Sequence, residues 1–170
     1  MHVRLDPEWP DVSDENLLAT IEKWLQPYLT NMSRLSHLER LDLSVILLAQ
    51  LSWQQQRQLD QLLPTHISVP SGSRIRVDYT HFPPVLAVRL QEMFGLADTP
   101  RIANGKIAVL LHLLSPAQRP VQITQDLAGF WQNSYHDVKK DLKGRYPKHH
   151  WPENPLTAQA TARARRKGES

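Results

Sequence analysis

The apolar pattern of the chain changes at Pro64. Before this residue, apolar side chains recur at helical spacing, as they do at Leu17, Leu18, Ile21, Trp24, Leu25 and Tyr28. After it, the stretches THISV and RIRVDY alternate apolar and polar residues on either side of the turn PSGS, which is typical of a β-hairpin. A proline stops a helix because it has no amide proton to donate. We therefore predict a helical segment over residues 1–63 and a β-rich domain from residue 64.

Several start signals divide the helical segment into three or four short helices. Ser13 is a good N-cap for a helix that ends near Pro27, and a further helical turn is expected over residues 35–40. Asp42 or Ser44 begins the apolar run VILLAQL, and Ser52 begins the last helix, WQQQRQLDQLL. The stripe that contains Trp24 is expected to be core.

The β-rich domain should hold five strands. The runs VLAVRL, IAVLLHLL and VQIT follow the hairpin, with one short helical segment, QEMFGL, between the third and fourth strands. This order predicts an α+β fold with a five-stranded antiparallel OB-like sheet or barrel, and an open antiparallel sheet is the alternative. A C-terminal helix follows, which Thr124 or Asp126 caps and Gly144 ends.

The stretch GRYPKHHWPENP, residues 144–155, follows that helix. Its three prolines predict that the chain runs extended over the surface from Pro147 onward, as a strap with Tyr146 and Trp151 as anchors. We expect the OB-like domain to span residues 64–155. Residues 156–170 carry almost no bulky apolar side chain and are predicted to form a disordered basic tail.

Positive charge is concentrated at the C-terminal end. Residues 1–138 hold 11 Lys and Arg against 14 Asp and Glu, whereas residues 139–170 hold 9 against 3. Such an end attracts polyanions through phosphate contacts and counterion release, although a solvated tail is the simpler explanation. Cations on the strands, the last helix and the strap, together with one aromatic ring, are the candidate nucleic-acid contacts: Arg74, Arg76, Arg89, Lys139, Lys140, Lys143, Arg145, Lys148 and Trp151.

Other chemistry finds little support in the sequence. The chain has no cysteine, no phosphate-binding glycine loop and no G-x-S-x-G or H-E-x-x-H motif, so we do not expect it to hydrolyse ATP alone. A metal-dependent enzyme that uses His136, His149 and His150 is a third hypothesis, but adjacent histidines in extended chain point to opposite sides. No membrane-spanning run or secretory signal is present, and a cytoplasmic location is expected.

Four strings together carry a family resemblance: PTHISVPSGSRIRVDY, PPVLAVRLQEMFGL, LLSPAQRPVQITQDLAGFW and SYHDVKKDLKGRYPKHHWPENP. With the earlier WPDVSDENLLATIEKWLQPYL, they resemble the C-terminal region of bacterial HrpB-type ATP-dependent helicases of the DEAH/RHA group, over about residues 9–155. The resemblance implies a parent enzyme whose ATPase motifs, ATP and Mg²⁺ lie in upstream motor domains. It places no cofactor and no catalytic residue on this chain.

Two functions follow as hypotheses. The first is an accessory domain that contacts single-stranded RNA or DNA, or guides it past the upstream helicase motor. The second is a structural domain that docks on the motor or on another partner without touching nucleic acid.

Overall fold

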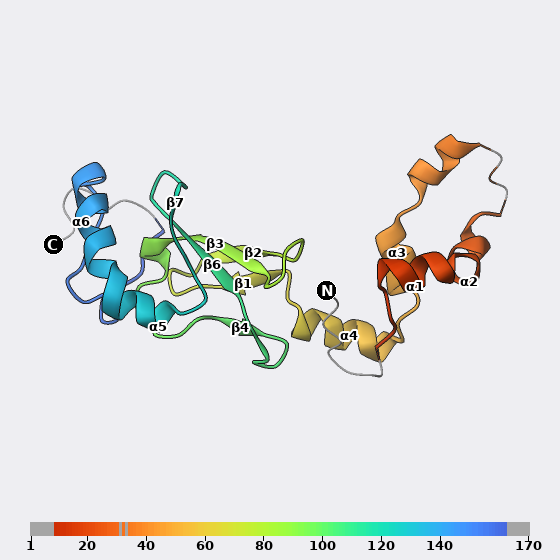
Figure 1. Ribbon diagram of the computed structural model, residues 1–170, viewed down its shortest axis with the longest axis horizontal. Coiled ribbons are helices and arrows are strands. Elements are labelled where there is room, and N and C mark those ends of the chain that lie inside the picture. The colour runs from red at the N-terminus through yellow and green to blue at the C-terminus, as the bar shows by residue number, and fades with distance from the viewer. Residues whose placement is uncertain (1–8, 31, 33, 163–170) are drawn as a thin grey trace. The chain divides into compact units, whose positions relative to one another are not determined.

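The chain divides into two compact units between Leu62 and Leu63, one residue before the expected boundary. The computed structural model describes residues 9–30, 32 and 34–162 (Figure 1). The first unit is helical, with α1 (Asp14–Ala19), α2 (Ile21–Leu25), η1 (Gln26–Tyr28), η2 (Leu35–Arg40), α3 (Leu43–Leu48) and α4 (Trp53–Leu62).

Side-chain caps start the helices of the first unit where the sequence predicts them. The Ser13 hydroxyl accepts from the Asn16 amide at 3.2 Å, and the Asp42 carboxylate accepts from the amides of Ser44 and Val45. At α4 the capping is reciprocal, because the side chains of Ser52 and Gln55 each accept from the other's backbone amide.

The single helix expected from Ser13 to Pro27 is interrupted at Thr20. The Thr20 hydroxyl donates to the Asn16 carbonyl at 2.7 Å, and its backbone angles (φ −114°, ψ 17°) leave the helical region. A hydroxyl that bonds the preceding turn in this way competes with the helix ladder. The result is α1 and α2 in place of one helix.

The second unit holds a mixed sheet in the order β1-β2-β3-β6-β7, which corrects the prediction of an antiparallel sheet. Its strands are β1 (His66–Ser68), β2 (Arg74–Asp78), β3 (Val85–Arg89), β6 (Leu110–Leu114) and β7 (Pro120–Thr124). β3 and β6 are parallel, with Val85 opposite Leu110 and Arg89 opposite Leu114. Within the described residues no pairing joins β7 to β1, so the OB-like barrel is not confirmed.

The crossover between β3 and β6 explains the parallel pair. It contains η3 (Leu90–Glu92) and a separate two-stranded sheet of β4 (Arg101–Ile102) and β5 (Ile107–Ala108). The excursion returns the chain to the end of the sheet where β3 began, and a parallel pair needs such a connection. The expected strand over IAVLLHLL is consequently split at Val109, whose amide donates to the Pro100 carbonyl.

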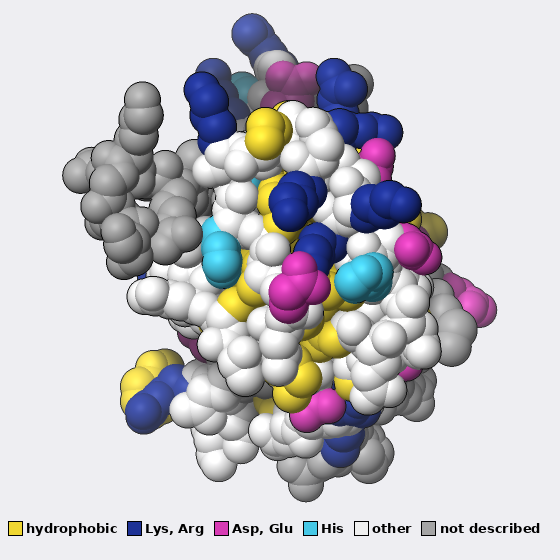
Figure 2. All heavy atoms as spheres, turned by 90° about the vertical axis from the view of Figure 1, so that its left-hand side faces the viewer, with side chains coloured by type: hydrophobic (Ala, Val, Ile, Leu, Met, Phe, Trp, Pro, Cys, Tyr) yellow, Lys and Arg dark blue, Asp and Glu magenta, His cyan; other side chains and the backbone are white. Residues whose placement is uncertain are grey.

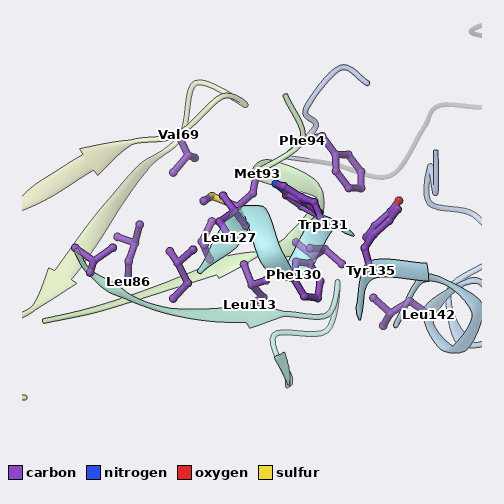
Figure 3. Close-up of a cluster of buried hydrophobic side chains, with 14 of the residues drawn as sticks. Val69, Leu86, Met93, Phe94, Leu113, Leu127, Phe130, Trp131, Tyr135 and Leu142 are labelled. Carbon is purple, nitrogen blue, oxygen red and sulfur yellow. The ribbon is translucent and has the colours of Figure 1, made fainter. Parts of the chain in front are cut away.

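The core begins on one face of the sheet and continues to the C-terminal helices at one end of it (Figures 1 and 3). Leu86, Val88, Leu111 and Leu113 are almost fully buried on that face. Against them pack aromatic and aliphatic side chains of α5 (Leu127–Gly129), η4 (Phe130–Ser134, a π-type turn) and α6 (Tyr135–Arg145). The Trp131 and Tyr135 rings meet edge to face at 5.4 Å, a favoured arrangement for aromatic pairs.

The C-terminal helical region starts where it was predicted to start but ends one residue later. Asp126 caps α5 as expected, accepting from the Gly129 amide at 2.8 Å. α6 however continues through Gly144 to Arg145, because Gly144 does not take the left-handed conformation that ends a helix.

The strap is anchored as predicted, and the contacts extend beyond it. Trp151 is 9% exposed, and its indole donates to the Tyr146 carbonyl at 2.9 Å. Further on, the Thr161 amide donates to the Gln91 carbonyl, and Ala158 and Ala160 pack against the core. Residues 156–162 therefore do not belong to a disordered tail, since small side chains and backbone bonds fix them. The rest of the predicted tail, 163–170, lies outside the described residues.

Candidate nucleic-acid interface

The outer face of the sheet carries cations from neighbouring strands. On β2, Arg74 and Arg76 point outward and are exposed, whereas Ile75 and Val77 face the core. On the neighbouring strand β1, His66 lies opposite Arg76. Because opposite residues of a ladder share a face, these three side chains lie on one surface.

The same face continues across the two central strands. The β2–β3 register, with Val77 opposite Leu86, places Ala87 level with Arg76 and Arg89 level with Arg74. Ala87 in turn pairs with His112 on β6. We call His66, Arg74, Arg76, Arg89 and His112 the sheet group.

Arg89 is partly neutralised by a buried carboxylate. Its Nε donates to Glu92 Oε1 at 2.7 Å, and the Ser71 hydroxyl donates to the other carboxylate oxygen at 2.9 Å. Burial raises the pKa of Glu92, but the hydrogen bonds from Ser73, Arg89 and Ser71 together bring this pKa below its usual value. Glu92 therefore stays charged and holds the guanidinium of Arg89, which is still 31% exposed.

A second set of cations lies on α6 and the strap. Figure 2 faces the side on which α6 lies in Figure 1, and it shows Lys and Arg side chains gathered there with carboxylates between them. Four predicted contacts are exposed at this end, and we call them the helix group: Lys140, Lys143, Arg145 and Lys148. Of these four cations, only Arg145 forms an ion pair within the described part of the chain, with Asp141 at 3.2 Å.

Two of the predicted contacts, Lys139 and Trp151, have other roles. The Lys139 side chain is 7% exposed, and its ammonium contacts the exposed carboxylate of Glu153 at 2.5 Å. The hydrogen bond from Lys139 lowers the pKa of Glu153. Lys139 and Trp151 therefore hold the strap on the domain and do not offer a free charge or an open ring face to a ligand.

Arg89 is the member of the sheet group whose charge reaches the strap. The positive charge of Arg89 acts on His149 of the strap, whose pKa is lowered by burial first and by Arg89 second. His149 Nδ1 also lies 3.3 Å from the amide nitrogen of the buried Gln91. The cationic face of the sheet thus continues to the strap through Arg89.

The exposed aromatic rings lie elsewhere than the sequence analysis placed them. Trp151, the one aromatic ring among the candidate contacts, packs inward as an anchor of the strap. Tyr79 and Phe82, in the turn between β2 and β3, are 39% and 50% exposed. Two aromatics inside a short loop between strands, DYTHFPP, are the signal that could have pointed to them.

The histidines do not form a metal site in the described residues. No three His, Asp or Glu side chains of residues 9–30, 32 and 34–162 are arranged to hold an ion. In the same ranges, none of the helices is both long and apolar enough to span a bilayer.

Comparison with known proteins identifies the family. The family described as ATP-dependent helicase C-terminal, HrpB type, matches residues 24–155. The ATP-dependent RNA helicase HrpB of Escherichia coli (strain K12) is 50% identical over 160 residues, which cover 94% of this chain and 20% of the helicase.

Solved structures agree with this relation. The crystal structure of the E. coli DExH-box NTPase HrpB has a TM-score of 0.84 at 50% identity, over 92% of this chain and 20% of that one. A structure of the E. coli DEAH/RHA helicase HrpB gives 0.67 at the same identity, over 85% of this chain and 18% of that one. This chain spans about a fifth of the relatives' length. It belongs to the family of C-terminal regions of HrpB-type ATP-dependent helicases.

Proposed function

We propose that this chain is an accessory domain of an ATP-dependent helicase and contacts single-stranded RNA or DNA that the motor handles. The observation that carries the proposal is the sheet group, in which the strand register gathers Arg74, Arg76 and two histidines on one exposed face. Phosphate contacts of this kind supply most sequence-independent affinity. The motor, with its ATP and Mg²⁺, would lie outside this chain.

Salt dependence of binding tests this proposal. Fluorescence anisotropy of labelled single-stranded RNA and DNA oligomers is measured with the 170-residue chain over a range of salt. For single strands, log K should fall with log[salt] by about 0.7 for each phosphate contact. The variant R74E/R76E should bind more weakly and reduce that slope by about 1.4 or more.

Matched variants keep the test specific. R101E/K106E makes the same charge change on the separate β4–β5 hairpin and should leave the slope close to wild type. K140E/K143E reports how far the helix group contributes. Absence of binding to either oligomer at low ionic strength, with the chain folded, would contradict the proposal.

A second function, docking on the motor, is favoured by the first unit. Among the described residues of this unit only Ile46 is a buried hydrophobic side chain, while Leu18, Val45 and Trp53 are 69%, 59% and 72% exposed. An apolar pocket of about 190 Å³ also opens here, lined by Trp9, Pro10, Val12, Leu47, Leu48, Leu51 and Leu59. Apolar surface of this extent on a small unit is typical of a protein contact.

Capture by the motor portion of the longer helicase separates the two functions. L18E/V45E should abolish capture and leave oligomer binding intact. R74E/R76E should weaken oligomer binding and leave capture intact. If L18E/V45E is captured as well as wild type, the first unit is not the docking surface.

A further inference from the structure

The turn between β2 and β3 presents two aromatic rings beside the sheet group. Among the large apolar side chains that are exposed in the described part of the second unit, Tyr79 and Phe82 are the aromatic ones. Both come from the loop that joins the strand of Arg74 and Arg76 to the next strand.

Hydrogen bonds at the start of this turn fix its first ring. The Tyr79 hydroxyl donates to the Pro64 carbonyl at 2.9 Å, and burial raises the pKa of this hydroxyl, so that it stays protonated. The next residue, Thr80, donates to Asp78 Oδ1 from its amide at 2.8 Å and from its hydroxyl at 2.6 Å. The ring of Tyr79 is thus positioned before any ligand arrives, which lowers the entropic cost of binding.

A hollow joins the first ring to a cation. It has a volume of about 570 Å³, and residues 76–80 line it, among them Arg76 and Tyr79. The carboxylate in this lining, Asp78, is held by Thr80. Across the ladder from Arg76 stands His66. The lining thus combines a cation for a phosphate with an aromatic ring for a base, and it also holds the carboxylate of Asp78, whose pKa the hydrogen bonds from Thr80 lower.

We propose that Tyr79 and Phe82 are a base-stacking site, on which unpaired nucleobases of a single strand rest while Arg76 contacts the adjoining phosphate. This inference rests on the proposed function and names its base-contacting residues. Stacking on aromatic side chains accepts every base, because each base has a π-face, and it needs an unpaired strand. The chemistry therefore favours single-stranded nucleic acid over a duplex.

Substitutions at Phe82 test the site in the full 170-residue chain. F82L keeps an apolar side chain but removes the aromatic face, and F82W keeps the face. F82L should weaken binding of a single-stranded oligomer at least about fivefold with an unchanged salt slope, and F82W should bind as wild type. Leu156, which lies outside the sheet, is 45% exposed, so L156A is a control of similar exposure that should leave affinity unchanged.

A spectroscopic readout reports stacking directly. An oligomer that contains 2-aminopurine should show a fluorescence change when its base stacks on the wild-type chain, and this change should be lost in F82L. If F82L binds as well as wild type, stacking is wrong and the phosphate contacts stand. The same conclusion follows if affinity falls from wild type to F82L to F82A only in proportion to the apolar area that each substitution removes. If the wild-type chain binds no oligomer at all, the stacking site and the proposed function both fail.

Discussion

Lys139 and Glu153 form an ion pair whose two members differ strongly in burial. The Lys139 side chain is 7% exposed and that of Glu153 is 81% exposed. Removing the glutamate leaves a buried ammonium without its partner, whereas removing the lysine leaves a carboxylate that water solvates. The two single substitutions are therefore not equivalent.

We expect E153Q to lower the stability of the chain more than K139M does. Methionine has a similar length and buries no charge, so K139M should stay within about 1 kcal/mol of wild type. Urea unfolding followed by tryptophan fluorescence gives both values. In the E153Q/K139M double variant much of the loss should be recovered, and an additive result would show that the pair does not couple.

His149 should make stability fall on the acid side of neutrality. Burial and the charge of Arg89 lower its pKa below the ordinary value of 6.5. The unfolded chain then takes up the proton more readily than the folded chain, so stability is present above about pH 6.5 and is lost as the pH falls below it. Arg89, Gln91 and the rings of Tyr146 and Trp151 lie around this imidazole.

H149Q should remove this part of the pH dependence, measured as the change in melting temperature between about pH 7 and pH 5. H150Q, which removes the neighbouring imidazole and leaves His149 in place, is the control and should retain the loss. If H149Q and wild type lose stability equally over this range, the cause lies in another group.

At the scale of the element, α6 contains a glycine, Gly144, at a position whose backbone conformation does not require one. Gly144 has no left-handed angle, and a Cβ built on it would meet nothing within 4 Å. G144A should therefore stabilise the chain by about 0.5–1 kcal/mol, because alanine lowers the entropy of the unfolded chain and favours the helix. Chemical denaturation measures the change.

Gly72 supplies the matched control. It too has open space around its Cα, but its φ is +85° in the turn between β1 and β2. G72A should destabilise by about 1 kcal/mol because a side chain at this positive φ is strained. Equal effects at both glycines would contradict the conformational explanation.

The strands were predictable from alternation, but their arrangement was not. All five expected strands contribute to the sheet: RIRVD has a clear period of two, whereas VLAVR and LLHLL are short apolar runs between turns. The parallel β3–β6 pair depends on the crossover between them, in which the two-residue strands β4 and β5 are too short for any periodicity. Direction and closure of a sheet are properties of its connections, and no local pattern reports them.

The sequence predicted which charged residues the candidate site contains, but not which of them are exposed. Sequence placed Arg74 and Arg76 on one face, since alternate residues of a strand share a side. It could not separate Lys139 from Lys140, because burial under Glu153 depends on where the strap folds back. Nor could it rank Phe82 above Trp151, since both rings have prolines and basic or imidazole side chains nearby in sequence.

At the scale of the whole molecule, the two units differ in how well each supports its own fold. The second unit holds 17 buried residues in one hydrophobic cluster, so it has a core of its own. Among the described residues of the first unit the longest helix, α4, has 10 residues, and helices this short are marginal in water without packing. The first unit should therefore depend on other protein surface for its structure.

Fragments divided at the boundary between the units test this dependence. Residues 63–170 should give a cooperative thermal transition by near-ultraviolet circular dichroism, because the aromatic cluster of Phe94, Trp131 and Tyr135 lies entirely within them. Residues 1–62 alone should show weak helicity, bind a hydrophobic dye and melt without cooperativity. Addition of the helicase motor portion should raise that helicity if the exposed apolar side chains dock there, and L18E/V45E should prevent the gain. A first unit that melts cooperatively by itself would mean that its apolar surface is tolerated without a partner.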